Sequence, residues 1–517
     1  MASRMWSGML YVFIKTRSFF VSIFLCCFNG KIVWAETVTL TSLSGGFKIE
    51  GDLIEADAHL FTLETDFGEV TLNRDKVTCT GEACPDHHQS SVLLSADPTF
   101  IERFLLPQFQ AFVRHKNLNV QELYSSDGID LILSTKTGNE IVIFTLKSSS
   151  TDDAIRDLIA GTADVAISDR PLNEEERSMI EVTSCGQVKS KVGQYLLAKD
   201  ALVLVKNPQS TTNDLTLSAL LELIEAHFLS SKNSKPDFTL YLSGSLSVLE
   251  NFTRTGKDMN KKDILADIDT LRQFIEKDAT GIGIVPKSIA QGLQIHEFYD
   301  RCGEYIHVNA RTIETGDYPF SFSLFAFTSP SPLPEMARSF FEFLSSPMGQ
   351  MVAERTGYVR TSSRPQPFVE QGGRLSHALI NASSDVTISN LKDMVRNLKP
   401  KKRLSTTFRF LNGNLELDQN SKAMLLRLAS DIRSGDYRNT KLSLVGFRDS
   451  DGSAQTNLSI SLIRAEYVKE ALFTLLEPED PLRESIETLT FGEVLPITCD
   501  NSSLGQKTNR RVEVWVE

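Results

Sequence analysis

Strand-like and helix-like segments alternate between about residues 91 and 367, and this alternation restricts the possible folds more than any other feature. Short apolar runs such as Ile141–Leu146 and Ile282–Val285 alternate with amphipathic stretches such as Phe100–Lys116 and Ile264–Lys277. Such alternation predicts an α/β domain. A stretch of roughly 275 residues is long enough for two α/β lobes with a cleft between them.

Length and charge set further bounds. The chain has 517 residues, so we expect two to four domains. The hydrophobic fraction of 41% is typical of globular protein. The formal net charge of −12 argues against binding to nucleic acid or to an anionic membrane surface. An anionic ligand must therefore be held by local dipoles, because the global field does not attract it.

The first 35 residues resemble an export signal. Lys15 and Arg17 precede the apolar run 18–28, and Ala35 ends a Val-Trp-Ala sequence. This pattern predicts a secretory signal peptide over residues 1–35, cleaved after Ala35. The charge at Lys31 leaves an uncleaved anchor as the alternative. No later run is long enough to span a bilayer, so we expect an exported chain.

Residues 36–90 alternate in the manner of short β-hairpins and predict a small β-domain. Cys79 and Cys84 bracket four residues at its end, and we expect them to form a disulfide in an oxidising compartment. Cys185 and Cys302 could pair with each other, which would leave Cys499 over. The sequence does not decide between these pairings.

Polar segments follow the predicted strands of the α/β region in a characteristic order. They are Ser148–Asp152, Ala163–Leu172, Leu242–Ser245, Thr280–Val285, Tyr318–Ser323 and Ser346–Gln350. Their order and spacing over about residues 91–367 resemble the periplasmic phosphate-binding proteins of the PstS type. The resemblance implies a two-lobed periplasmic-binding-protein (type II) domain that closes on an oxyanion. Helix N-termini rich in Ser, Thr and Gly can hold such an anion without positive charge.

The same resemblance assigns the phosphate ligands residue by residue. The donors would be Thr99 and Phe100, Ser150 and Thr151, and Ser243, Gly244 and Ser245. Asp169 would accept the proton of a bound phosphate and so select phosphate over sulfate. The chain lacks the arginine that this family often places ahead of Ser243, and two cations are missing from Tyr318–Ser323. The alternative is that the Ser and Thr residues only cap helices.

Residues 368–403 are polar and include the basic run Lys399–Arg403, which predicts a solvated linker with a short helix. Residues 404–517 then predict an α+β domain of order βαβαββ. Its strands are expected near 407–410, 441–447, 487–491 and 512–516. Its helices are expected at 419–433 and after Ser461, a candidate N-cap that places Arg464 at the start of the second helix.

Three motifs in this last region carry polar side chains. They are Gly446–Asp449, Asn457–Ala465 and Asn509–Glu513. In this order they resemble the OmpA-like peptidoglycan-binding domain. The resemblance implies that Asp449 takes the ammonium and Arg464 the carboxylate of diaminopimelate, with Asn457, Asn509 and Arg510 in the matching motifs. The alternative is an ordinary surface ion pair.

The sequence therefore predicts a multidomain protein of a Gram-negative periplasm, associated with the cell wall or outer membrane. It would bind phosphate or a related oxyanion and attach non-covalently to peptidoglycan, with an ABC permease as a candidate partner. We expect no enzyme activity, cofactor or metal, because the chain lacks the common catalytic and metal-binding motifs. The first alternative is a structural or sensory envelope protein whose cleft no longer binds phosphate and contacts another protein. A weaker one is an enzyme acting on a phosphorylated ligand.

Overall fold

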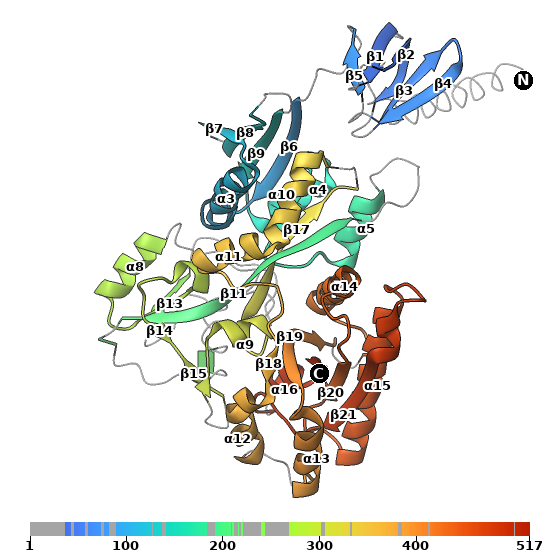
Figure 1. The fold of residues 1–517 in the computed structure, drawn as a ribbon. Helices are drawn as coiled ribbons and strands as arrows, with labels where there is room; N and C mark the ends of the chain where they lie inside the picture. The colour runs from blue at the N-terminus through green and yellow to red at the C-terminus, as the bar shows by residue number, and fades with distance from the viewer. Residues whose placement is uncertain are drawn as a thin grey trace, which may run out of the picture.

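The computed structural model (Figure 1) contains three successive β-rich regions, coloured from blue to red along the chain. The residues it describes are 37–42, 46–56, 60–73, 77–81, 89–126, 128–136, 141–182, 192–207, 209–210, 216, 219–220, 239–242, 268–300, 305–330, 333–380, 385–411, 414–500 and 502–517. Within these residues, no helix is both long enough and apolar enough to cross a membrane.

The N-terminal region is a five-stranded antiparallel sheet. Its strands are β1 (Thr37–Ser42), β2 (Lys48–Ala56), β3 (Leu60–Thr65), β4 (Gly68–Asn73) and β5 (Val77–Thr80), in the order β4-β3-β2-β1-β5. Alternate side chains such as Val38, Leu40 and Leu63 are buried on one face. The predicted hairpins are therefore present, and their core is small.

One continuous sheet runs through the α/β region. Its strands follow the order β12-β13-β11-β17-β10-β6-β9-β8-β7, with β14 paired to β11. Their bounds are β6 (Gln89–Ala96), β7 (Asn119–Tyr124), β8 (Gly128–Ser134), β9 (Ile141–Ser148), β10 (Val165–Ser168), β11 (Gly193–Lys206), β12 (Thr239–Leu242), β13 (Gly281–Pro286), β14 (Ile295–His296) and β17 (Ser321–Thr328). Strand β11 joins the two lobes, because residues 193–201 pair with β17 and residues 202–206 pair with β13.

Helices cover both faces of the first-lobe part of this sheet (Figure 1). One face packs against α3 (Leu106–Lys116), α10 (Glu335–Ser345) and α11 (Pro347–Arg355), where the rings of Phe109 and Phe340 stack with centroids 3.8 Å apart. The other face packs against α4 (Thr151–Ile159) and α5 (Glu174–Val182). The remaining elements of the region are α2 (Pro98–Phe100), η2 (Ile101–Leu105), α8 (Ile268–Lys277), η4 (Lys287–Ile289), β15 (Phe298–Tyr299), β16 (Tyr305–Ile306) and α9 (Ala310–Glu314).

The C-terminal region is a five-stranded mixed sheet of order β18-β19-β22-β20-β21. Its strands are β18 (Gln366–Pro367), β19 (Lys402–Arg409), β20 (Leu442–Phe447), β21 (Ile486–Gly492) and β22 (Arg511–Val516). Helices α14 (Gln419–Ser434) and α15 (Ala454–Phe473) pack on one face. Two short elements, η6 (Pro481–Ser485) and α16 (Ser503–Asn509), complete the α+β domain.

The linker expected at residues 368–403 is packed structure. Residues 368–398 form η5 (Phe368–Gln371), α12 (Gly372–Ile380) and α13 (Ile388–Leu398), which cover the second face of the C-terminal sheet. Met394 and Leu398 are buried there with Trp515. The interpretation of a polar tether was wrong because each short helix buries one apolar face, which the polar average of the segment hides.

Two cations of the basic run Lys399–Arg403, Lys401 and Arg403, are buried, whereas Lys399 and Lys402 are exposed. Lys401 pairs with Glu487 and Glu517 at 3.1 and 2.9 Å. Arg403 is 1% exposed and binds Asp317, which belongs to the α/β region, at 2.8 Å. Lys401 and Arg403 therefore form ion pairs within the protein.

The C-terminal domain is docked on the α/β domain. A single apolar cluster contains side chains of α4, β10 and β17 together with side chains of α14, β19 and β22. Polar contacts surround it: the Gln419 amide donates to Glu174 at 2.9 Å, and the Ser405 amide N–H donates to the Ser363 hydroxyl at 2.9 Å. In Figure 1, α14 accordingly lies against the α/β domain below α5 and β11.

Candidate functional site

The first candidate site lies where β20 ends beside α15. Gly446 permits this approach, because a Cβ at that position would lie 2.0 Å from the carbonyl oxygen of Ser461. Asp449 follows three residues after Gly446, and Arg464 follows three residues after Ser461. The close packing of strand on helix therefore brings the predicted acid and base to one place.

The predicted helix start at Ser461 is wrong. Helix α15 begins at Ala454, and its N-cap is Ser453, whose hydroxyl accepts the Thr456 N–H. The Ser461 hydroxyl instead donates to the carbonyl of Asn457 at 2.6 Å within the helix. A serine in a helix interior can bond the preceding turn in this way, and sequence alone does not separate that use from capping. Arg464 therefore receives no help from free N–H groups of a helix start.

Charges at this site are unevenly matched. Asp449 is fully buried, with Arg510 at 2.5 Å and Arg448 at 3.2 Å. Arg464 is 6% exposed, and its Nε and Nη1 atoms have no hydrogen-bond partner within the described part of the chain. Its guanidinium lies over the ring of Phe410, 5.1 Å from the centroid. Three arginines thus lie near one carboxylate, so the site has excess positive charge that a second anionic group could balance.

Burial sets the protonation of this arginine. Desolvation, followed by the charges of Arg448 and Arg510, lowers the pKa of Arg464 to about 10, while Asp449 opposes the shift. Arg464 still carries its charge at neutral pH. A buried cation without a hydrogen-bond partner is costly, and a ligand carboxylate would supply two acceptors in the geometry of a guanidinium.

The two predicted asparagines support loops around the site. The side-chain oxygen of Asn457 accepts from Arg448 Nη1 at 2.7 Å, and its side-chain NH₂ group donates to the Glu493 carboxylate. The side-chain oxygen of Asn509 accepts the Ile497 N–H at 2.7 Å, and its side-chain NH₂ group donates to the backbone carbonyl of Thr498 at 2.7 Å. Both side chains are fully buried. Their contact with a ligand stays a prediction, and the bonds observed are positioning bonds.

Sequence reasoning missed Arg448 and Phe410. Arg448 stands inside the Gly446–Asp449 motif, and the motif itself could have indicated it. Phe410 follows the end of β19, and only the fold places its ring beneath Arg464.

The second candidate site is the predicted anion site of the α/β domain. Thr151 and Asp169 meet there, with the Thr151 hydroxyl 3.0 Å from Asp169 Oδ1. The Ser150 hydroxyl caps α4 and donates to the Asp153 carboxylate at 2.6 Å. The Thr99 N–H donates to Asp97 at 2.9 Å. These donors already have partners, and the partners are carboxylates of the chain itself.

The remaining predicted phosphate ligands divide into two groups. Phe100 is 4% exposed, and its side chain belongs to the first-lobe core. Ser243, Gly244 and Ser245 lie outside the described residues. The structure therefore brings Thr151 and Asp169 together and leaves the second-lobe donors untested.

Asp97 was missed by sequence reasoning. Burial raises its pKa, and the nearby Asp169 adds to that shift, against the hydrogen bonds from Thr99. An aspartate before a proline at a helix start is an N-cap pattern, so the sequence did contain the signal. Arg170, which could have supplied positive charge, pairs with Asp152 at 2.7 Å and Glu176 at 2.8 Å.

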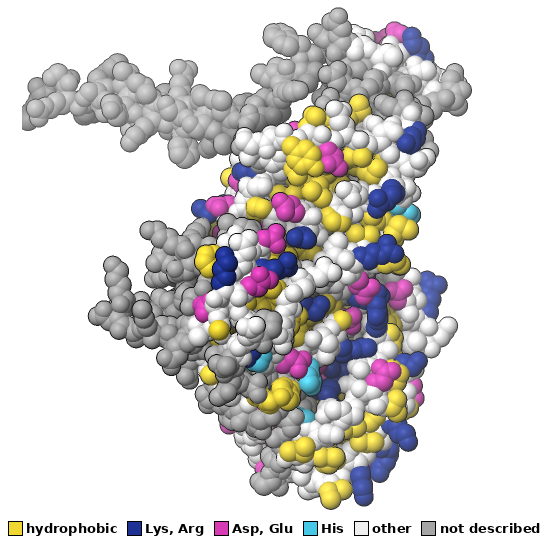
Figure 2. Space-filling model, turned by 90° about the vertical axis from the view of Figure 1, so that its left-hand side faces the viewer, with side chains coloured by type: hydrophobic (Ala, Val, Ile, Leu, Met, Phe, Trp, Pro, Cys, Tyr) yellow, Lys and Arg dark blue, Asp and Glu magenta, His cyan; other side chains and the backbone are white. Residues whose placement is uncertain are grey.

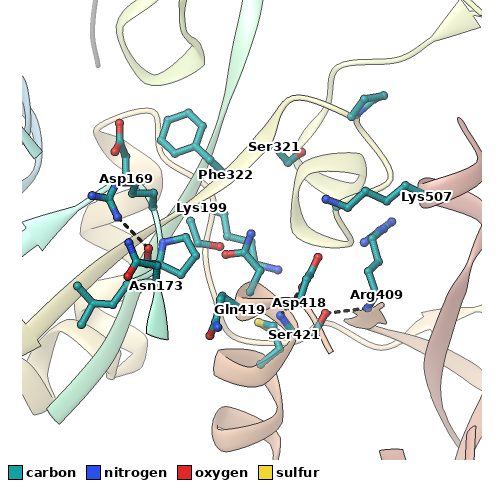
Figure 3. Close-up of a pocket in the computed structure, with 18 of the residues that line it drawn as sticks. Asp169, Asn173, Lys199, Ser321, Phe322, Arg409, Asp418, Gln419, Ser421 and Lys507 are labelled. Atoms are coloured by element: carbon teal, nitrogen blue, oxygen red, sulfur yellow. Dashed lines mark hydrogen bonds between the residues drawn. The ribbon is translucent and has the colours of Figure 1, made fainter. Parts of the chain in front are cut away.

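Asp169 also lines a cavity of about 970 Å³ between the two docked domains (Figure 3). The α/β domain contributes Asp169, Lys199 and Ser321–Ser323. The C-terminal domain contributes Arg409, Asp418–Ser421 and Lys507. Arg409 lines this cavity, whereas the next residue, Phe410, lies beneath Arg464 of the first site.

Metals, disulfides and surface charge complete the description. Within the described residues, no group of three or more His, Cys, Asp or Glu side chains is arranged to hold a metal ion. Cys79 and Cys499 are disulfide-bonded, with partners outside those residues, so Cys499 is not left over and the pairing of Cys79 with Cys84 stays a prediction. On the face shown in Figure 2, basic and acidic side chains are interspersed.

Comparison with known proteins divides the chain in the same way. The PBP superfamily domain matches residues 125–347, and the OmpA family matches residues 409–510. The chain thus carries a PBP-like domain followed by an OmpA domain. The OmpA domain is the α+β unit that contains Asp449 and Arg464.

Individual proteins are similar to parts of this chain. The probable lipoprotein YiaD of Escherichia coli K12 is 34% identical over 79 residues, which are 15% of this chain and 34% of that protein. A possible phosphate-binding protein from Planctomyces limnophilus is 19% identical over 53% of this chain and 94% of its own, with a TM-score of 0.37. The peptidoglycan-associated lipoprotein of Burkholderia pseudomallei is 20% identical over 22% of this chain and 90% of its own, with a TM-score of 0.19.

Proposed function

We propose that this protein is a binding protein of the Gram-negative periplasm that attaches to peptidoglycan through its OmpA domain and carries a solute-binding PBP-like domain. The observation that carries the proposal is Arg464, a buried cation beside the buried Asp449, whose Nε and Nη1 have no hydrogen-bond partner among the residues that the structure describes. No catalytic role is proposed for either site.

The wall ligand is diaminopimelate, which ends in a carbon bearing both an ammonium and a carboxylate. Arg464 binds the carboxylate through two parallel N–H donors. Asp449 accepts from the ammonium with Oδ1, while Arg510 and Arg448 hold that carboxylate in place. The ring of Phe410 restricts the Arg464 side chain, so less rotational freedom is lost on binding.

Sedimentation with purified sacculi tests this assignment. Arg464→Ala and Asp449→Ala each remove a charge-assisted contact, and we expect a loss in affinity of at least about 30-fold, or roughly 2 kcal/mol. The control is Arg433→Ala, which removes an exposed arginine at the end of α14. If both site variants sediment as the control does, the wall site is not at Asp449 and Arg464.

Phosphate or a related oxyanion is the first candidate solute for the PBP-like domain. The Thr151–Asp169 contact supports it, because a carboxylate beside a hydroxyl donor suits a protonated oxyanion. We propose titration of phosphate into the chain from Glu36 onward, with micromolar or tighter binding expected, about 8 kcal/mol. Asp169→Asn should then change the preference for phosphate over sulfate.

A second function follows from a specific observation. The Thr99 N–H and the Ser150 hydroxyl, two of the proposed phosphate donors, are bonded to Asp97 and Asp153. Phosphate would have to displace two carboxylates that repel it. These contacts favour a cleft that no longer takes free phosphate, in an envelope protein that recognises something else. Absence of heat on phosphate titration, with sacculus binding intact, would select this second function.

A further inference from the structure

The cavity between the two domains is walled by both of them. Its C-terminal wall is held in place by buried contacts: Arg403 binds Asp317 at 2.8 Å, and Arg409 donates to the Thr315 carbonyl at 3.2 Å. Arg403 is 1% and Asp317 8% exposed at the side chain. Because these contacts are desolvated, breaking them would be costly, and the C-terminal side of the cavity is part of the fold.

The size of the cavity points to an organic ligand. Sites for organic ligands occupy about 300–1,000 Å³, and this cavity of about 970 Å³ lies at the upper end of that range. An inorganic phosphate ion would fill only a small part of it. Apolar side chains from both domains, Phe322 and Met424 among them, line the cavity between its polar groups.

The charges of the cavity are separated. Figure 3 places Asp169 on one side and Arg409 and Lys507 together on the other. Lys507 is exposed and makes no ion pair with any described residue. Lys199 lies between these walls, and its Nζ donates to the Glu314 carbonyl. An ammonium has three donors, so Lys199 can also bind a ligand acceptor.

From this arrangement we propose that the cavity binds a short peptide with free ends, its ammonium toward Asp169 and its carboxylate toward Lys507 and Arg409. The inference rests on the proposed solute-binding function and names the class of solute. A free amino acid carries both charges on one carbon, whereas Asp169 and Lys507 lie on opposite sides of the cavity. Two to four extended residues separate the charges by roughly 7–14 Å.

Lys199 adds a condition on the ligand. Desolvation lowers its pKa to about 8, and the charge of Glu314 opposes that shift ahead of the smaller effect of Arg409. Lys199 is therefore mostly protonated at neutral pH and donates to an oxygen acceptor of the ligand. A peptide backbone supplies such acceptors along its length, which an inorganic anion does not.

The test uses the chain from Glu36 onward and native mass spectrometry. The probe is an equimolar pool of di- to tetrapeptides with free ends, and a second pool has the same sequences with acetylated and amidated ends. We expect the chain to retain peptides from the first pool at least tenfold more than from the second. Lys507→Glu should reduce retention at least tenfold, whereas the control Lys392→Glu, which makes the same charge change on the exposed side of α13, should not.

Three results would overturn the proposal: no retained peptide, equal retention of both pools, or equal retention by Lys507→Glu and Lys392→Glu. The peptide pool contains no diaminopimelate, so failure of sacculus binding would count against the wall site and leave the peptide result standing. Tight phosphate binding without peptide retention would support the oxyanion function and reject this one.

Discussion

Asp317 is the position at which a single substitution most directly tests the docking of the two domains. Asp317 lies in the loop after α9, and its carboxylate contacts the C-terminal domain. Arg403 binds it at 2.8 and 3.1 Å, and Arg409 binds it at 3.4 Å. Two further arginines and Glu513 complete this buried cluster, which holds Asp317, Arg374, Arg403, Arg409, Arg511 and Glu513. The substitution is Asp317→Asn, which keeps the shape and removes the charge.

The magnitude follows from the charge balance. The cluster has four arginines and two carboxylates, so losing Asp317 leaves Glu513 as the one acid among the described residues of the cluster. Removing one partner of a buried ion pair costs about 3–5 kcal/mol, because the other charge stays desolvated. We therefore expect Asp317→Asn to lower the free energy of unfolding by about 3 kcal/mol or more.

Trp515 provides the assay. In the chain from Glu36 onward it is the remaining tryptophan, and its indole N–H donates to Glu513 at 3.1 Å. Urea unfolding followed by tryptophan fluorescence therefore reports on the cluster itself. The control is Asp393→Asn, an exposed carboxylate on α13 that pairs with Arg396, where we expect a change below about 0.5 kcal/mol. Equal midpoints for the two variants would refute the reasoning.

Three further predictions concern the same domain. Burial alone would raise the pKa of Glu513, but Arg374, Arg403 and Arg511 lower it to about 2, so stability should be constant from about pH 7 to 5 and fall below about pH 4.5 in the same urea assay. Gly446→Ala should cost about 3 kcal/mol or more and reduce sacculus binding, because its Cβ meets the Ser461 carbonyl at 2.0 Å, whereas Gly373→Ala, with open space around it, should be neutral. Asp300 accepts the Cys499 N–H at 3.0 Å, so non-reducing peptide mapping should find Cys499 linked to Cys302, two residues along the chain from Asp300; a link to Cys185 would contradict this.

The sequence predicted the elements that depend on local pattern. Apolar patterns located strands in all three regions, and the three C-terminal motifs singled out Asp449 and Arg464 before any fold was known. The strand predictions were possible because periodicity is a property of neighbouring residues, and the ligand contacts of Asp449 and Arg464 stay predictions. The PBP-like and OmpA domains were both recognisable on this basis.

Long-range partners could not be predicted in the same way. Arg403 looks like part of a basic linker, yet its partner Asp317 lies 86 residues away in another domain. Asp97 looks like a helix cap, and it is one, but its cap occupies the N–H expected to bind phosphate. In each case the residue type was clear, and the identity of its partner depended on the folded chain.

Strand β19 ends between the two sites, with Arg409 turned to the cavity and Phe410 turned to Arg464. A molecule held at the wall site and a molecule in the cavity would thus be separated by one strand end. Any shift of β19 on sacculus binding would change the cavity, and the coupling would be reciprocal, since each ligand must alter the affinity for the other by the same factor. Peptide fragments released from peptidoglycan could then bind in the cavity close to where they are released, before they diffuse away.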